Sequence, residues 1–525
     1  MNSIPRQQLD YLRSSAWKDF DSYDQNKIRV EVQIGHCSTS VGSDRVAQAI
    51  SDSLPDSHYV VVTGCDGACF DGPQVLIYDP INGPTRFSKT SSDQAPLITR
   101  GLAAANSNSS AFFKHQKRVS LDLSGALDPS NVKDYIRHNG YNGLVTAFEM
   151  SPDEVIAEVE ASGLRGRGGA YFPAALKWRG SRKASGDITY LVINAEEGEP
   201  GVFKDRHLME GVPYRILEGA VIAGYASGAS QAFLYINAEA ELSAQRMELA
   251  VRQSEENGLL GDNILGSGYS LRVEIYRGAG GYVCGEETTL LNTVEGHRRE
   301  PRIRPPFPTD SGLWANPTVI NNPETLASIP FILSNGASVF NNIGIENATG
   351  TKLVSVSGAV RNPGVAEVPM GTSLEHIIMA VCGGPPEGSL LRALAVGGPS
   401  SGILPADMME LSISPGLIHP SGIMLGAGGI IALGEDAHLV EAVRSLAAYN
   451  SAESCGKCTP CREGTPRMVD YIDQLASNFG DGRHSEELRQ LAYTINQASL
   501  CGLGQAAGNP IISALELFPD LFKNR

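Results

Sequence analysis

Four cysteines near the C-terminal end restrict the fold more than any other feature of this chain. Cys455, Cys458 and Cys461 form a C-x₂-C-x₂-C run, and Cys501 follows further along. Three closely spaced thiolates can coordinate one face of an iron–sulfur cubane, and a distant fourth thiolate completes the coordination. Zinc sites instead favour two C-x₂-C pairs. We therefore predict a [4Fe–4S] cluster, with a zinc ion that stabilises helices as the alternative.

The residues around these cysteines are expected to be helical. From about residue 436 onward, four segments place apolar side chains three and four positions apart, which is the spacing of amphipathic helices. The cluster should therefore lie in a compact helical bundle, residues 433–525. The chain has nine cysteines, and ligand spacing of this kind is typical of metal binding in a reducing compartment rather than of disulfides.

The rest of the chain predicts several α/β units, since its 525 residues are too many for one hydrophobic core. Strand-like runs at 28–35, 58–64 and 74–80, with a helix at 44–54, give the β-α-β-β order of a small thioredoxin-like module. Strands then alternate with helices and glycine-rich loops up to about residue 340. A further small α/β module follows, with a helix expected at 374–381.

Charge and hydropathy exclude several functions. The formal net charge is −16, which disfavours general electrostatic binding to nucleic acid or to an anionic membrane. No run reaches the roughly 18–20 apolar residues needed to cross a bilayer, and the N-terminus lacks the apolar region of a secretory signal. We expect a cytoplasmic protein that does not insert into membranes.

Three glycine-rich loops predict a cofactor site. They span residues 163–178, 194–206 and 277–291. Glycines let backbone amides approach a phosphate closely, and the first loop adds positive charge and aromatic side chains. The second loop follows a strand directly, where an α/β sheet presents polar groups to ligands. None of the loops fits G-x-G-x-x-G or a Walker A motif, so the residues alone indicate an iron–sulfur protein with a phosphate-bearing cofactor.

The motifs taken together resemble a known family. GLRGRGGAYFPAALKW, NAEEGEPGVFKDR, GAGGYVCGEETTLL, PPFP, NNPETLA and SCGKCTPCREG occur in this order from about residue 125 to the end. They resemble the 51-kDa flavoprotein family, which includes the NADH-binding subunit of respiratory complex I and the diaphorase subunits of NAD-linked hydrogenases and formate dehydrogenases. The resemblance implies an α/β multidomain fold and electron transfer between NAD(H), FMN and a [4Fe–4S] cluster.

The resemblance also assigns domains and residues. After the thioredoxin-like domain and linker (1–115), it implies a Rossmann-like FMN/NADH-binding domain (116–340), a ubiquitin-like SLBB domain (341–432) and the cluster bundle (433–525). The expected FMN ligands are Gly166, Arg167, Gly168, Lys177, Asn194, Glu196, Tyr282, Gly285, Glu286, Asn321, Asn322 and Thr325, with Glu197 and Arg304 counted among the cofactor-binding residues.

The same resemblance identifies residues for the nicotinamide cofactor. Phe172 and Phe307 are expected to sandwich NADH, and Glu199 and Glu287 to hold its sugar and amide groups as the residues closest to the chemistry. The alternative for these two glutamates is a structural role, either in a salt bridge or as a carboxylate at the start of a helix. Cys455, Cys458, Cys461 and Cys501 would ligate the cluster.

Two positions depart from the family pattern. Residue 196 is Glu where the family often has Asp, and residue 304 is Arg where respiratory members often have Lys. The first change lengthens a flavin contact by one methylene, and the second keeps the charge but changes its geometry. Neither change argues against NADH.

The N-terminal module resembles the [2Fe–2S] domain of the 24-kDa partner subunit, but its cysteines are incomplete. Cys37, Cys65 and Cys69 are present, whereas Gly42 occupies the fourth ligand position. His36 or a serine is a conceivable replacement. We expect this module to lack a [2Fe–2S] cluster and to serve in docking.

The fused module favours a diaphorase subunit over complex I. The leading hypothesis is the beta subunit of a soluble NAD-dependent formate dehydrogenase, because the sequence also ends without the ferredoxin-like domain of many bifurcating hydrogenases. The alternatives are a hydrogenase diaphorase, the complex I subunit, and a structural electron-transfer adapter without NADH reactivity. The expected partners are a thioredoxin-like [2Fe–2S] subunit and a large iron–sulfur catalytic subunit, either a molybdenum or tungsten formate dehydrogenase or a hydrogenase.

Overall fold

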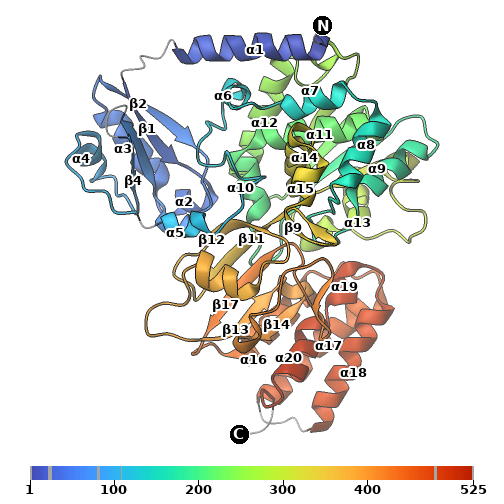
Figure 1. The fold of residues 1–525 in the computed structure, drawn as a ribbon. Helices are drawn as coiled ribbons and strands as arrows, with labels where there is room; N and C mark the ends of the chain where they lie inside the picture. The colour runs from blue at the N-terminus through green and yellow to red at the C-terminus, as the bar shows by residue number, and fades with distance from the viewer. Residues whose placement is uncertain (1–2, 22–26, 80–82, 108, 478–481, 523–525) are drawn as a thin grey trace.

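The computed structural model describes residues 3–21, 27–79, 83–107, 109–477 and 482–522. A thioredoxin-like module, a central α/β domain, a second α/β domain and a C-terminal helical bundle follow one another along the chain (Figure 1). In the described residues, no helix is both long and apolar enough to span a bilayer.

The N-terminal module is built on a four-stranded sheet in the order β2-β1-β3-β4. β1 (Ile28–Gln33) pairs parallel with β2 (His58–Thr63) and antiparallel with β3 (Val75–Asp79), and β4 (Gly83–Phe87) closes the far edge. The β-α-β-β order is confirmed, with α3 (Ser43–Ser53) as its helix; β4 was not predicted. The short helices of this region are α2 (His36–Ser40), α4 (Ala95–Thr99) and α5 (Ser110–Lys114).

The first helix was not predicted, and it changes one domain boundary. α1 (Ile4–Asp21) lies across the top of the molecule and contacts α6 (Val132–Arg137) and α7 (Asn142–Phe148) of the central domain (Figure 1). Leu9 and Ala16 are buried in the central domain's core. Apolar burial therefore places α1 with the FMN-domain region, not with the thioredoxin-like module as the expected 1–115 unit had it.

The central domain contains a parallel sheet in the order β7-β6-β5-β8. Its strands are β5 (Tyr190–Ala195), β6 (Gln231–Ile236), β7 (Arg272–Arg277) and β8 (Thr318–Asn321). The helices are α8 (Pro152–Ala161), α9 (Ala174–Lys183), α10 (Lys204–Gly211), α11 (Pro213–Ser227), α12 (Glu241–Glu256), α13 (Glu287–Val294), α14 (Pro323–Asn335) and α15 (Ala337–Asn341).

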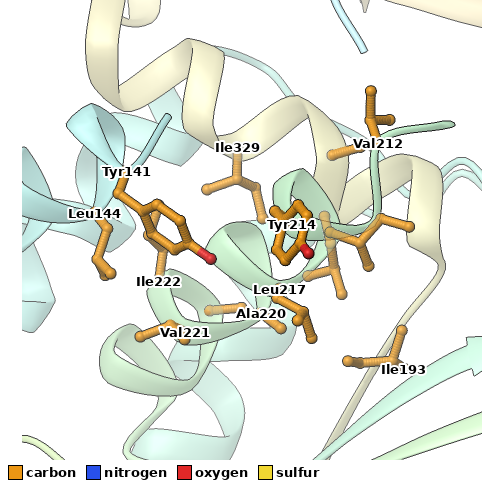
Figure 2. Close-up of a cluster of buried hydrophobic side chains, with 14 of the residues drawn as sticks. Tyr141, Leu144, Ile193, Val212, Tyr214, Leu217, Ala220, Val221, Ile222 and Ile329 are labelled. Atoms are coloured by element: carbon orange, nitrogen blue, oxygen red, sulfur yellow. The ribbon is translucent and has the colours of Figure 1, made fainter. Parts of the chain in front are cut away.

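Helix α11 is the centre of this domain's core. Nearly all its residues are buried, as expected for a helix that is apolar on every side. Figure 2 shows Tyr214 and Leu217 of α11 surrounded by Tyr141 from the start of α7, Ile193 from β5 and Ile329 from α14. This packing fixes β5 and β8 relative to the helices, and so fixes the loops at the ends of the two strands.

The next domain has a mixed five-stranded sheet in the order β12-β11-β17-β13-β14. A π-helical turn at His376–Val381 occupies the position of the predicted helix. The long strands are β11 (Thr351–Gly358), β12 (Gly364–Pro369), β13 (Leu391–Val396), β14 (Gly402–Pro405) and β17 (Gly429–Gly434); the short ones are β9 (Gly344–Ile345), β10 (Ala348–Thr349), β15 (Leu417–His419) and β16 (Ile423–Met424).

The C-terminal region is the helical bundle that the sequence predicts. Its helices are α16 (Leu439–Ala452), α17 (Thr459–Ala476), α18 (Gly482–Ala498), α19 (Gly502–Ala506) and α20 (Asn509–Leu517). Their apolar faces share one core, to which Ile403 of β14 also contributes. The bundle is therefore fixed to the second α/β domain.

Buried charges join the two α/β domains. Glu324 at the start of α14 pairs with Lys352 of β11 at 2.5 Å and with Lys204 at 2.9 Å, and all three side chains are at most 1% exposed. The Glu324 carboxylate also accepts from the backbone N–H of Leu353 at 2.8 Å. Because each charge has a partner, the network avoids the cost of an isolated buried ion.

Candidate functional site

The predicted cofactor loops meet at one edge of the central sheet. The second loop follows β5, the third follows β7, and Asn322 follows β8. Since the four strands are parallel, their carboxyl ends share an edge, where open α/β sheets bind ligands. Asn237, directly after β6, joins this edge and was missed; the same strand-end argument could have found it.

Glu196 is the clearest sign of a missing ligand. Its Oε1 accepts from Asn237 Nδ2, but its Oε2 is buried without a hydrogen-bond partner. Burial raises the pKa of this carboxyl to about 7. Buried polar atoms are almost always paired, so the unpartnered oxygen fits a polar group of a bound cofactor. Nearby, Asn194 Nδ2 donates to the carbonyl of Gly285 at 2.8 Å.

The first glycine loop folds back on itself beside β8. Gly166 N donates to the carbonyl of Phe172 at 2.8 Å, and Arg167 N donates to Thr325 Oγ1 at 2.9 Å. A Cβ on Gly168 would lie 3.2 Å from Cβ of Asn322. The loop thus brings bare backbone to the sheet edge, as phosphate binding requires.

Arg167 itself has a different partner set from the one expected. Its guanidinium is fully buried and donates to the carbonyls of Thr351, Arg165 and Thr349 at 2.7–2.9 Å. The side chain therefore fastens the loop to the next domain. Its backbone N–H is also engaged, by Thr325 Oγ1, so a role of Arg167 toward an FMN phosphate stays a prediction.

Two other expected ligands make hydrogen bonds within the protein. Asn321 Oδ1 accepts from the indole N–H of Trp178 at 3.0 Å. Asn322 caps α14 through its Oδ1, which accepts from Glu324 N, and its Nδ2 donates to Asp205 at 2.7 Å. Both side chains are oriented by these bonds at the carboxyl end of β8.

Two of the expected glutamates are helix caps. Glu286 Oε2 accepts from the backbone N–H groups and hydroxyls of Thr288 and Thr289, which begins α13. Glu197 accepts from the backbone N–H groups of Asp205 and Arg206 in the first turn of α10. A carboxylate that satisfies N-terminal amides stabilises its helix, so both residues shape the loops that end β5 and β7.

Glu287 lies between two cations. Its Oε1 is 2.8 Å from Arg304 and its Oε2 is 3.3 Å from Lys177. All three side chains are partly exposed, so the charges can re-pair with an incoming ligand at moderate cost. The structure shows the salt bridge that the sequence left as an alternative, and a role toward NADH stays a prediction.

Two of the expected cofactor residues are exposed aromatic rings. Phe172 is 50% and Phe307 is 51% exposed. Phe172 belongs to the first glycine loop, and Phe307 comes three residues after Arg304. Exposed aromatic faces at a sheet edge offer stacking surface, which fits the expected contact with a nicotinamide or adenine ring.

Glu199 faces the SLBB and cluster domains rather than solvent. Burial raises its pKa to about 7, and Ser400 and the hydroxyl of Tyr282 are its hydrogen-bond partners. The Tyr282 hydroxyl is also 2.5 Å from Ser400 Oγ. No pattern in the sequence singles out Ser400, because it reaches the site from a different domain.

The bundle supplies one wall of the same region. Tyr449 of α16 donates to the carbonyl of Gly198 at 2.7 Å, and Glu453 accepts from the backbone N–H of Tyr282 at 2.8 Å. Both residues precede Cys455 within a few positions. The flavin loops and the cysteine loop are thus directly bonded to each other.

The four C-terminal cysteines line one pocket. Cys458 and Cys501 are the N-cap residues of α17 and α19, and Val283 and Leu503 are among the other lining residues. The four thiols therefore face one pocket, as the ligands of a single [4Fe–4S] cluster must.

Fold and site together define a protein that carries a flavin and an iron–sulfur cluster and reacts with a nicotinamide cofactor. Comparison with known families agrees. Residues 159–331 match the Nuo51 FMN-binding domain, residues 353–404 the SLBB domain, and residues 441–525 the NADH-ubiquinone oxidoreductase-F iron-sulfur binding region.

The chain belongs to the 51-kDa flavoprotein family of NADH oxidoreductases. It is 41% identical over 410 residues (78% of this chain, 84% of the relative) to the NADP-reducing hydrogenase subunit HndC of Solidesulfovibrio fructosivorans. It is 42% identical over 385 residues (73% and 91%) to an NADH-quinone oxidoreductase subunit of Rhizobium meliloti. FMN, NAD(H) and a [4Fe–4S] cluster are its cofactors, as predicted.

A solved structure matches almost the whole chain. A chain of NAD⁺-reducing [NiFe]-hydrogenase superposes with a TM-score of 0.68 at 27% identity, covering 98% of this chain and 87% of that one. The mixed α/β multidomain fold with its SLBB domain and helical cluster region is confirmed. The relatives named above are subunits of larger assemblies.

Proposed function

We propose that this chain is the NAD(H)-reacting diaphorase subunit of a soluble NAD-dependent formate dehydrogenase. The observation that carries the diaphorase role is the direct connection between the flavin loops and the cysteine pocket. Tyr282 contacts Glu199 in the flavin region, while the next residue, Val283, packs against Cys461 and Cys501. Two cofactor sites joined by neighbouring residues suit electron transfer better than a structural adapter does.

The residues at the sheet edge then have distinct tasks. Glu196 supplies an unpaired oxygen for the flavin, while the bare backbone of the first glycine loop receives its phosphate. Phe172 and Phe307 offer stacking faces for the nicotinamide cofactor, and Glu287 exchanges its cationic partners for ligand groups. When bound, FMN accepts a two-electron hydride and releases single electrons. The protein contributes position rather than acid–base catalysis.

Formate is the leading terminal substrate because a fused thioredoxin-like module is expected of the formate dehydrogenase and hydrogenase relatives. H₂ is the second candidate, and one observation favours it. The hydrogenase chain matches 98% of this chain, so the N-terminal module is included, whereas the curated relatives cover 73–79%. The proposed partners are a thioredoxin-like [2Fe–2S] subunit and a large catalytic subunit. We place the assembly in the cytoplasm, since none of the nine cysteines, all of them described, forms a disulfide.

The deciding experiment is NAD⁺ reduction by the complex purified with this chain. Formate-driven reduction supports the proposal, and H₂-driven reduction without formate activity supports the second candidate. If the isolated chain holds FMN but NADH does not reduce a dye, the diaphorase role is overturned.

Glu287→Gln tests the nicotinamide site within the same assay. Loss of one carboxylate charge should raise KM for NADH by about tenfold, which corresponds to about 1.4 kcal/mol of binding. Glu274→Gln, on the outer strand β7, is the control and should leave KM unchanged. An unaltered KM in Glu287→Gln would remove this residue from the NADH site.

A further inference from the structure

Two of the three cysteines of the N-terminal module lie against a histidine of the central domain. Sγ of Cys65, Sγ of Cys69 and Nε2 of His207 all lie within 4.8 Å of one another. His207 belongs to α10, while Cys65 and Cys69 follow β2 of the thioredoxin-like sheet. The thiol of Cys37, in α2, is a close neighbour of that of Cys69. Two domains thus contribute to one group of soft ligands.

The histidine is oriented as a metal ligand. Its Nδ1 lies 3.0 Å from the carbonyl of Phe203, which requires the proton on Nδ1 and leaves the Nε2 lone pair facing the sulfurs. Metal-bound histidines typically make this second hydrogen bond. Nε2 is 3.4 Å from Cys69 Sγ, and the side chain is 3% exposed.

The spacing fits one tetrahedral ion. Zn–S bonds of about 2.3 Å and Zn–N bonds of about 2.0–2.1 Å place ligand atoms roughly 3.5–3.8 Å apart in a tetrahedron. The Cys69–His207 distance is close to this value. In contrast, the C-terminal cysteines, which hold a multinuclear cluster, contain no such compact group among the described residues.

The backbone around the group is tightly packed. A Cβ on Gly64 would lie 2.4 Å from Cα of Gly211, at the end of α10. Glu210 accepts from the backbone N–H of His36 at 2.8 Å and lies 3.0 Å from its ring. These contacts hold the two segments together, so Cys65, Cys69 and His207 are positioned before any ion binds.

We propose that Cys37, Cys65, Cys69 and His207 bind one zinc ion that fastens the thioredoxin-like module to the FMN domain. The first three residues are the remainder of a [2Fe–2S] ligand set, and the missing fourth ligand is replaced from another domain rather than from position 42. Cys37 completes the tetrahedron by a rotation of its side chain toward the ion. Three thiolates and one imidazole form a common structural zinc set.

Metal analysis of the full chain tests this assignment. The wild type should contain about one zinc ion per chain in addition to cluster iron. Cys65→Ser and His207→Gln should each lower the zinc content at least fivefold. Cys382→Ser, a buried cysteine of the SLBB domain without a ligand neighbour, is the matched control and should retain zinc. FMN and cluster absorbance report whether each variant has folded.

Three results would overturn the proposal. The first is that the wild-type chain contains no zinc and takes up none when zinc is added. The second is that Cys65→Ser retains its zinc. The third is that the wild type contains extra iron, and that the visible absorbance of this iron disappears in Cys65→Ser. The last result would identify a [2Fe–2S] cluster. If the variants do not fold, Co²⁺ loading of the wild type decides: a thiolate-to-cobalt absorption band that zinc displaces supports the site, and its absence refutes it.

Discussion

The buried charges between the two α/β domains allow a quantitative test of what holds the site. Glu324 faces Lys352 and Lys204, and all three side chains are essentially inaccessible. Glu324→Gln keeps the shape of the side chain but removes its charge. Lys204 then retains Asp205 at 2.7 Å, whereas Lys352 retains only the carbonyl of Leu353 at 3.0 Å.

The expected loss follows from the uncompensated lysine. Removal of one partner from a buried ion pair costs about 3–5 kcal/mol. Burial already lowers the pKa of Lys352 to about 7, so Lys352 can release its proton in the variant and limit the loss to about 3 kcal/mol. At roughly 2–4 °C per kcal/mol for domains of this size, Tm should fall by about 6–12 °C.

Thermal unfolding of the purified chain, followed by circular dichroism and by release of FMN fluorescence, measures this loss. Asp262→Asn is the control, because it removes the exposed pair with Arg272, in which both side chains are 75% exposed; its effect should stay within about 0.5 kcal/mol. Adding Lys352→Met to Glu324→Gln should recover part of the stability. A Tm change no larger than that of Asp262→Asn, or strict additivity in the double variant, would refute the reasoning.

Three further predictions concern other parts of the molecule. Leu9→Ala should destabilise the central domain by about 2–5 kcal/mol, because Leu9 is fully buried, while exposed Tyr11→Ala should change it little; equal effects in chemical denaturation would contradict the placement of α1. Glu286→Ala should cost about 0.5–2 kcal/mol by uncapping α13, measurable as a lower Tm that Glu286→Gln partly restores. Burial raises the pKa of Glu196 to about 7 from 4.5, so its stabilising contribution is complete below pH 4.5 and is lost as pH rises through 7. The free energy of unfolding of FMN-free chain should therefore fall less steeply over this range in Glu196→Gln, and identical slopes would disprove the shift.

Local patterns predicted much of this fold. The alternation of apolar strands with glycine loops gave the α/β class, and the amphipathic spacing after residue 436 gave the bundle. Helix α1 was not predicted because its apolar positions are few. It is stabilised by packing on α6 and α7, which lie more than a hundred residues away in the sequence. β4 contains Gly83 and Pro84, which disfavour strands, and pairing with β3 overrides that preference.

The site was predictable where motif residues are contiguous and less so where domains meet. The cysteine spacing located the cluster pocket, a strand end located Asn194, and the family motif NNPETLA supplied Asn322. The partners of Arg167 and Glu199 come from residues 349–351 and from Ser400, so no local pattern reveals them. His207 could not be predicted either, because it is distant in sequence from the cysteines that it contacts.

The bonds from Glu453 to Tyr282 and from Tyr449 to Gly198 have a consequence for how the protein is assembled in the cell. They make the segment just before the cluster cysteines a wall of the flavin region. Asn450 Nδ2 of the same helix also donates to the carbonyl of Pro399 at 2.8 Å. A cluster ligated by Cys455 would add a further restraint on this segment, so FMN should bind more weakly before the cluster is in place. Cluster insertion should therefore precede stable flavin retention, and chain made in iron-starved cells should be purified with little FMN. Iron supply would then control how much chain becomes competent to react with NADH.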